Sequence, residues 1–402
     1  MIKERKLSMP FWCVGNPVAD PFGSGVLAKV TALETAEIIA NAGKKGLIHY
    51  TAAHDCDLVK WNPENPEDDL DTAGDTCRQL KEIKAILKSG GIQFKMGSAA
   101  LHPDPVFRNG GLSNPDSRVR ALAAQKVMRA LRIINFLGGE YFTYWVARDG
   151  FETQFSVPWD KTYSYIRSAL NLVPKYCSEK KLSIKHGTIE YKPNEPRGEM
   201  YLPTVGHAIA MIMSLDKPDF WGVNPEVLQH DSMTNLSPVA AVAFALSMNK
   251  LLFLHVGSQK AGQFDNDNPP LLGMDGLKEL VSIFYILNKY DWKGYIEFDN
   301  HMFRTDAAPG EKNRIKLREK YIELCVDAYR LAEAKAFKLA SDKTIASKLV
   351  KIWKEDKNLD AILAKGDTAK IQSLAINYKA VVEEASAIGE LDLLVNKKIL
   401  ST

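Results

Sequence analysis

The segment LSIKHGTIEY (residues 182–191) is an apolar, β-branched run that ends in a glutamate and a tyrosine. A run of this kind predicts a buried strand whose carboxyl end carries polar side chains. Seven similar runs occur along the chain, at residues 10–15, 46–51, 93–98, 141–147, 220–224, 251–256 and 294–299. Stretches with helical periodicity separate them, such as residues 75–87 and 115–137. Eight strands alternating with helices predict an α/β fold, the (β/α)₈ TIM barrel, with an open doubly wound sheet as the alternative.

The chain changes character after the eighth of these runs. Residues 311–402 are rich in Lys, Ala, Leu and Glu with helical spacing, and they contain no convincing strand. We therefore expect a TIM-barrel catalytic domain over residues 1–338 and a helical C-terminal arm over residues 339–402. An arm that cannot bury its own apolar face usually packs on another subunit, so we expect a homotetramer or homodimer formed through it.

Composition narrows the function classes. Of the 402 residues, 46% are hydrophobic and 25% charged, the balance of a globular protein rather than a disordered one. A formal net charge of +3 gives no reason to expect a nucleic-acid partner. The five cysteines are odd in number and lie far apart, which favours reduced thiols and a cytoplasmic location. No apolar run is long enough for a signal peptide or a membrane span, so we expect no membrane partner.

Polar side chains gather after five of the predicted strands. In TIM barrels the catalytic groups lie at the carboxyl ends of the strands, so these residues should meet at one mouth. They are His54, Asp55 and Asp57 after the second strand, Glu190 and Lys192 at the fifth, Glu226 and His230 after the sixth, Asp265 and Asp267 after the seventh, and Asp299 and His301 at the eighth.

Carboxylates converging at a barrel mouth repel one another unless a cation neutralises them. Asp265 and Asp267 are two residues apart, so both can bind one cation, although they could equally be turn residues. Oxygen ligands with one imidazole and no cysteine favour Mg²⁺ or Mn²⁺ over zinc. Each carboxylate alone could be a helix cap or a surface charge. Trp12 and Trp145 fall on predicted strands, either filling the barrel or forming a flat wall for a sugar.

Several motifs resemble those of the D-xylose isomerase family, specifically its shorter, actinobacterial-type group. The most specific is IEYKPNEPRGEMYLPTVGHAIAM (residues 189–211). Others are FWCVG and ADPFG near the N-terminus, HDCD (54–57), HPDPVFRNGG (102–111), WVARDG (145–150), GVNPE (222–226) and FDND (264–267).

This resemblance implies two divalent cations, Mg²⁺, Mn²⁺ or Co²⁺, and a role for each matching residue. Glu190, Glu226 and Asp299 would ligate a structural cation, and Glu226 would be shared with a catalytic cation held by His230, Asp265 and Asp267. The remaining roles are His54 held by Asp57 as the ring-opening acid–base, Lys192 on the sugar carbonyl oxygen, Trp12 and Trp145 as an apolar wall, and Phe22 reaching into a neighbouring subunit's site.

The chain departs from the family pattern at the metal site and in the substrate wall. Gly257 stands where the family has an aspartate ligand, so the structural site would be weakened unless Ser258, Gln259 or water substitutes. His301 replaces a lysine and His102 an apolar phenylalanine, which makes them the substrate-binding residues that differ. The His230 assignment needs a one-residue insertion after Glu226; without it Gln229 would face the metal as a poorer ligand.

The resemblance implies a metal-dependent aldose–ketose isomerase that opens D-xylose or a related aldose and shifts a hydride. A divergent isomerase with another preferred sugar is one alternative. A ketose epimerase, which works with two glutamates on one cation, is a second. A catalytically silent sugar-binding barrel is the alternative from a different class, because a metal ligand and a lysine are missing.

Overall fold

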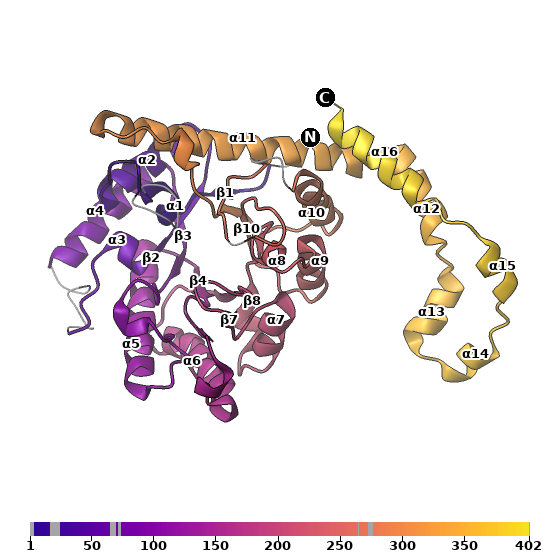
Figure 1. The fold of residues 1–402 in the computed structure, drawn as a ribbon, viewed down its shortest axis with the longest axis horizontal. Coiled ribbons are helices and arrows are strands. Elements are labelled where there is room, and N and C mark those ends of the chain that lie inside the picture. The colour runs from indigo at the N-terminus through magenta and orange to yellow at the C-terminus, as the bar shows by residue number, and fades with distance from the viewer. Residues whose placement is uncertain are drawn as a thin grey trace.

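The computed structural model describes residues 4–16, 25–64, 70, 74–263, 265–271 and 276–401. Its centre is one parallel sheet in the order β8-β6-β4-β3-β2-β1-β11-β10-β9 (Figure 1). The strands are β1 (Leu7–Ser8), β2 (Tyr50–His54), β3 (Gln93–Ser98), β4 (Tyr141–Trp145), β6 (His186–Glu190), β8 (Trp221–Val223), β9 (Glu226–Val227), β10 (Leu254–Val256) and β11 (Ile296–Phe298).

The sheet closes on itself. Its two ends, β8 and β9, are consecutive in the chain and separated only by Asn224 and Pro225, so they form one interrupted strand. Val223 of this strand also bridges in parallel to Leu251, just before β10. The barrel therefore has eight parallel strands, with β8 and β9 counted as one, and the prediction of a TIM barrel is confirmed.

Helices surround the barrel because each has one apolar stripe to bury. Residues 75–87 and 115–137, predicted as helices, lie in α4 and α5. The long helices are α2 (Ala32–Lys44), α4 (Asp75–Ser89), α5 (Ser117–Leu137), α6 (Trp159–Glu179), α7 (Val205–Met213), α9 (Pro238–Ser247), α10 (Leu277–Lys289) and α11 (Arg314–Ala340). Short helices α1 (Phe11–Gly15), α3 (Asp55–Leu58) and α8 (His230–Met233) and a hairpin of β5 (Gly150–Phe151) with β7 (Glu199–Met200) lie among the loops. Among the described residues, no helix combines the length and the apolar character needed to cross a membrane.

The first strand was predicted wrongly. In place of the predicted strand at 10–15, residues 11–15 form the short helix α1 after Pro10, and the strand is β1, where Leu7 pairs with Ile296. Pro10 explains the difference, because it has no N–H to donate to a neighbouring strand, whereas its carbonyl accepts from the N–H of Val14 in a helical turn. The predicted strand at 46–51 is also shifted, since β2 begins at Tyr50.

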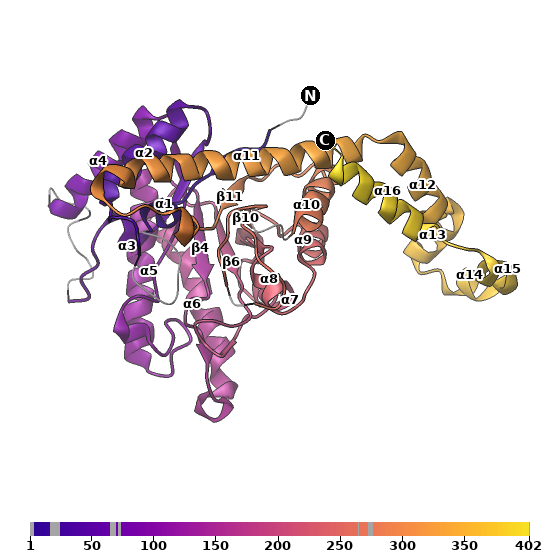
Figure 2. The ribbon, with the colours of Figure 1, turned by 45° about the horizontal axis from the view of Figure 1, so that its top comes forward.

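The C-terminal segment leaves the barrel. Helix α11 lies along the barrel, and α12 (Lys343–Trp353) and α16 (Ile388–Leu400) lie side by side beyond it (Figures 1 and 2). α13 (Lys357–Lys365), α14 (Thr368–Ser373) and α15 (Tyr378–Glu383) extend still farther away. Large apolar side chains of this segment are exposed, among them Val350, Trp353, Tyr378, Val381 and Leu393. The division at residue 338 and assembly through this segment stay predictions.

A buried ion cluster fixes the start of α3 beside the barrel mouth. The Asp55 carboxylate is fully buried and binds both the Lys126 ammonium and, at 3.1 Å, the Arg129 guanidinium. It also accepts from the Ala100 N–H at 2.9 Å. Because Asp55 immediately follows His54, this cluster holds the backbone of a candidate catalytic residue.

We expect Asp55→Asn to lower the free energy of unfolding by about 3 kcal/mol, because it leaves two buried cations without their counter-charge. Urea unfolding of the metal-free protein measures the effect. Asp116→Asn is the control, since Asp116 makes an ion pair with Arg118 that is exposed to solvent, and such pairs contribute only about 0–1 kcal/mol. Equal losses in the two variants would contradict the role given to the Asp55 cluster.

Candidate active site

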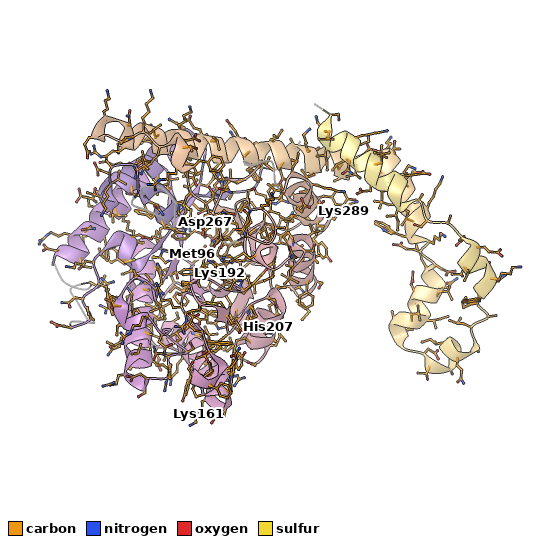
Figure 3. All side chains as sticks on the ribbon, viewed as in Figure 1. Met96, Lys161, Lys192, His207, Asp267 and Lys289 are labelled. Atoms are coloured by element: carbon orange, nitrogen blue, oxygen red, sulfur yellow. The ribbon has the colours of Figure 1, made fainter. Side chains whose placement is uncertain are left out.

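One pocket of about 580 Å³ opens where the strands end at the barrel mouth. Lys192, Asp267 and Met96, labelled in Figure 3, lie in the middle of the barrel and all line it. The other sequence-predicted residues that line it are Trp12, His54, His102, Trp145, Glu190, Glu226, His230, Asp265, Asp299 and His301. Asp57 lies behind His54 and not in the pocket lining, and Phe22 lies outside the described residues.

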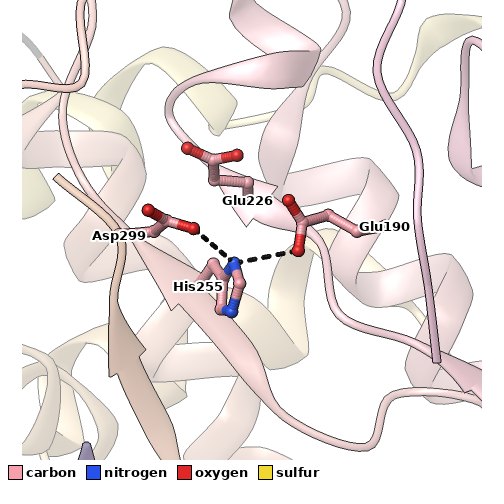
Figure 4. A group of neighbouring side chains, drawn as sticks. All are labelled: Glu190, Glu226, His255 and Asp299. Carbon is pink, nitrogen blue, oxygen red and sulfur yellow. Dashed lines mark ion pairs between the residues drawn. The ribbon is translucent and has the colours of Figure 1, made fainter. Parts of the chain in front are cut away.

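The first candidate metal group has four members, each on or directly after a different strand of the barrel: Glu190, Glu226, His255 and Asp299 (Figure 4). One ligand atom from each lies within 4.8 Å of the others. Nδ1 of His255 is 3.2 Å from Oε2 of Glu190 and 2.9 Å from Oδ2 of Asp299. Three carboxylates and an imidazole at this spacing fit a divalent cation.

His255 is the member that sequence reasoning missed. Its Nε2 lies 3.0 Å from Oε1 of the fully buried Glu297, which orients the ring so that Nδ1 faces the carboxylates. The signal was a histidine on a buried strand two residues before Gly257. The suggested substitute Gln259 instead donates to the Gln263 carbonyl and accepts from the Asn266 N–H, so it supports the loop.

The second candidate metal group consists of Glu226, His230 and Asp265. Nε2 of His230 is 2.7 Å from Oε2 of Glu226 and 3.6 Å from Oδ2 of Asp265. Of the two neighbours left open by the sequence, the structure brings His230 into the group. Glu226 belongs to both groups, so one carboxylate joins the two candidate positions. Asp267 lines the same pocket beside them.

The carboxyl groups of this pocket have pKa values shifted in opposite directions. Burial raises the pKa of Glu226 to about 8, against the lowering effect of His230. Burial and the neighbouring Asp265 raise the pKa of Asp267 well above its usual range. Burial opposes ionisation of Asp265 too, but the Lys192 and His230 charges hold its pKa well below its usual range. Neighbouring carboxylates repel one another when all are ionised. A bound divalent cation would offset this repulsion and favour the ionised forms.

Lys192 and the second group are linked directly. The Lys192 ammonium is 2.7 Å from Oδ2 of Asp265 and 3.7 Å from Oε2 of Glu195. Burial lowers its pKa, but Asp265, Asp267 and Glu195 raise the pKa further, so the net value lies above the usual range. The ammonium therefore stays charged and can donate to an oxygen in the pocket.

His54 and Asp57 form a hydrogen-bonded pair at the end of β2. Oδ2 of Asp57 lies 3.1 Å from Nδ1 of His54 and accepts from the His54 backbone N–H at 2.8 Å. This leaves Nε2 as the nitrogen free to exchange a proton. Burial lowers the pKa of His54, but the carboxylates of Asp57, Asp55 and Asp299 together raise it by more, so the net pKa lies above its ordinary value.

We expect Asp57→Asn to lower the pKa of His54, since the nearby carboxylate favours the charged imidazole. If neutral His54 is the active form, the acid limb of the activity–pH profile then moves to lower pH by a similar amount. The profile of kcat/KM against pH and NMR titration of the imidazole measure this shift. A His54 pKa that stays unchanged or rises would contradict the pairing described here.

Aromatic rings also line the pocket, and Nε1 of Trp12 donates to Oδ1 of Asp299 at 2.7 Å. The Trp12 ring is 4.7 Å from the His54 ring, and the Trp145 ring is 4.9 Å from His102. Burial and the neighbouring His54 lower the pKa of His102 to about 3, so its imidazole is neutral. Burial also lowers the pKa of His301, whose Nε2 is 3.6 Å from Oδ2 of Asp267. The rings are tilted to one another, by 52° between Trp12 and His54 and by 83° between Trp145 and His102, so they form an angled aromatic surface with neutral imidazoles that can hydrogen-bond a hydroxyl.

No family model matches the chain, but individual proteins do. Xylose isomerase of Thermus thermophilus is 31% identical over 308 residues, which cover 76% of this chain and 75% of that protein. D-psicose 3-epimerase of Clostridium cellulolyticum, solved with D-tagatose, has a TM-score of 0.55 at 15% identity, with 82% of this chain and 99% of that chain covered. The IOLI protein, solved with a zinc atom, has a TM-score of 0.56 at 12% identity, with 83% and 99% covered.

The closed barrel and these two solved structures define the class by its fold, an α/β TIM barrel with an acidic pocket at its mouth. Within that class, the sequence identity to the Thermus enzyme over three quarters of both chains is decisive. The chain belongs to the xylose isomerase family.

Proposed function

We propose that the protein is a metal-dependent aldose–ketose isomerase acting on D-xylose or a related aldose. The observation that carries the proposal is the arrangement of two metal groups sharing Glu226 in the same pocket as the His54 imidazole. The donor sets fit two divalent cations. Oxygen ligands with one imidazole each suit Mg²⁺, Mn²⁺ or Co²⁺, and His255 supplies a ligand that Gly257 cannot.

The chain's own residues can carry the proton and positioning steps. Nε2 of His54 takes the proton of the anomeric hydroxyl and returns it to the ring oxygen as the bond between C1 and that oxygen breaks, while Asp57 holds the tautomer. Lys192 donates to the carbonyl oxygen of the open chain and fixes its position. Trp12 and Trp145 exclude water, which favours transfer of hydride from C2 to C1 over proton loss to solvent. Bound cations would polarise the carbonyl and the adjacent hydroxyl.

We expect the metal-loaded protein to convert at least one aldose to its ketose, and chelation to abolish the conversion. The measurement is ketose formation from a panel of pentoses, tetroses and hexoses with Mg²⁺, Mn²⁺ or Co²⁺. Chelator-treated protein and protein given the metal back are the controls. A protein that binds metal but converts no aldose would overturn the isomerase and leave the silent sugar-binding barrel.

A ketose epimerase is the second candidate, favoured by one observation. Glu190 and Glu226 both belong to the first metal group, and two glutamates on one cation suit proton removal and return at a carbon beside a carbonyl. The same panel extended to ketoses separates the candidates. Epimerised ketose without any aldose–ketose conversion would replace the isomerase with the epimerase.

The C-terminal segment supports an oligomer in this proposal. Its exposed apolar side chains include Val382, Ile388 and Leu400, each more than half exposed. Burying them on a second copy would remove apolar surface from water. Light scattering of the full chain, compared with a chain ending after α11, tests whether this segment holds the subunits together.

A further inference from the structure

The Gln229 side chain fills the space that a side chain at position 257 would need. A Cβ atom at position 257 would lie 2.2 Å from Oε1 and 2.5 Å from Cδ of Gln229, and 2.9 Å from the Asp299 carbonyl. Gln229 is completely buried. No side chain, and therefore no aspartate, can occupy position 257 while the Gln229 amide is there.

The Gln229 amide contacts the backbone of one member of the first metal group and a carboxylate that lies beside the second. Its Nε2 donates to Oδ1 of Asp267 at 2.9 Å and to the Asp299 carbonyl at 3.0 Å. Asp299 supplies a carboxylate to the first group, and Asp267 lies beside the second. Oε1 of Gln229 has no hydrogen-bond partner among the described residues. The Gln229 amide therefore uses its N–H groups but not its oxygen. Its position is set by the hydrogen bonds that it donates to Asp267 and Asp299.

The backbone before Gln229 explains how the amide reaches this space. Leu228 has a positive φ of 63°, which is unusual for a branched side chain. This turn lies between β9 and α8. The turn therefore brings the Gln229 amide into the space beside Gly257.

We propose that Gln229 is a positioning residue that replaces a side chain at position 257 and joins the two metal groups. Its neutral amide orients the Asp267 carboxylate and the Asp299 backbone, where an aspartate at 257 would add a sixth carboxylate to Glu190, Glu226, Asp265, Asp267 and Asp299. The proposal rests on the metal binding in the proposed function, but its tests need no turnover.

Gln229→Leu keeps most of the volume and removes the amide. In metal-stripped protein titrated with Mn²⁺, with free Mn²⁺ followed by electron paramagnetic resonance, we expect at least one site to bind about tenfold more weakly, as for loss of a group that orients a ligand. The control is Gln79→Leu, which removes a Gln79 amide that donates to the Leu58 carbonyl away from the metal groups. Wild-type affinity at every site in Gln229→Leu would overturn the positioning role.

A double-mutant cycle on metal-free protein tests the exchange of space. We expect Gly257→Ala to lower the unfolding temperature, and the loss to be smaller when Gln229→Ala is also present, because the two shortest contacts of the new Cβ are then gone and only the one with the Asp299 carbonyl remains. Additive effects of the two changes would overturn the proposal. Because this cycle contains neither metal nor sugar, failure to isomerise any aldose would overturn the proposed function and leave this result standing.

Discussion

Glu226→Gln should lower kcat/KM for aldose isomerisation by about 10⁴-fold, because one carboxylate serves both metal groups and cations contribute several kcal/mol each. The amide keeps the size of the side chain but loses the negative charge that both groups share. In the wild-type protein the Glu226 carboxylate is also buried beside His230, with Oε2 of Glu226 2.7 Å from Nε2 of His230. We therefore expect weaker Mn²⁺ binding at both sites rather than one, measured by titration of metal-stripped protein.

Glu140→Gln is the matched control. Glu140 is a partly buried glutamate directly before β4, at the opposite end of the barrel, and it pairs with Lys95 and Lys185. Its loss should leave metal stoichiometry and kcat/KM near wild type. If Glu226→Gln weakened only one site, or left activity within tenfold, Glu226 would not be the shared ligand that the two groups indicate.

The barrel was predictable from the sequence because its signals are local and repeated. Buried strands show as apolar runs, and residues 93–98 coincide with β3. The first strand escaped because only the residues Leu7–Ser8 pair, too few for a periodic signal, and the apolar FWCVG beside them forms α1. The break of one strand into β8 and β9 likewise depends on how the backbone pairs in the folded structure, and the composition of the segment does not show it.

The pocket was predictable in its residue types but not in its partners. Strand ends in a barrel converge, so Glu190, Glu226 and Asp299 could be grouped from topology alone. His255 could not, because Gly257 drew attention to a missing ligand and nothing in the sequence says which way an imidazole ring faces. The contact of Gln229 with position 257 joins segments that are distant along the chain, so only the folded structure reveals it.

The His54–Asp57 pair makes a prediction that separates ring opening from the later steps. His54→Asn should lower kcat/KM for cyclic pentoses by about 10³-fold, the scale of a lost general acid–base. Glyceraldehyde cannot form a stable ring, so its conversion to dihydroxyacetone should fall less than about tenfold if His54 acts only on the ring.

Comparing the two substrates within one variant cancels any general damage to the fold or to metal binding. His207→Asn serves as the control for replacing a histidine, since His207 is exposed on α7 and absent from the pocket lining (Figure 3). An equal loss on both substrates would assign His54 to a step after ring opening, such as holding the open chain. The ratio of the two losses therefore reports which proton His54 moves. Only the cyclic sugar requires a proton to pass from the anomeric hydroxyl to the ring oxygen.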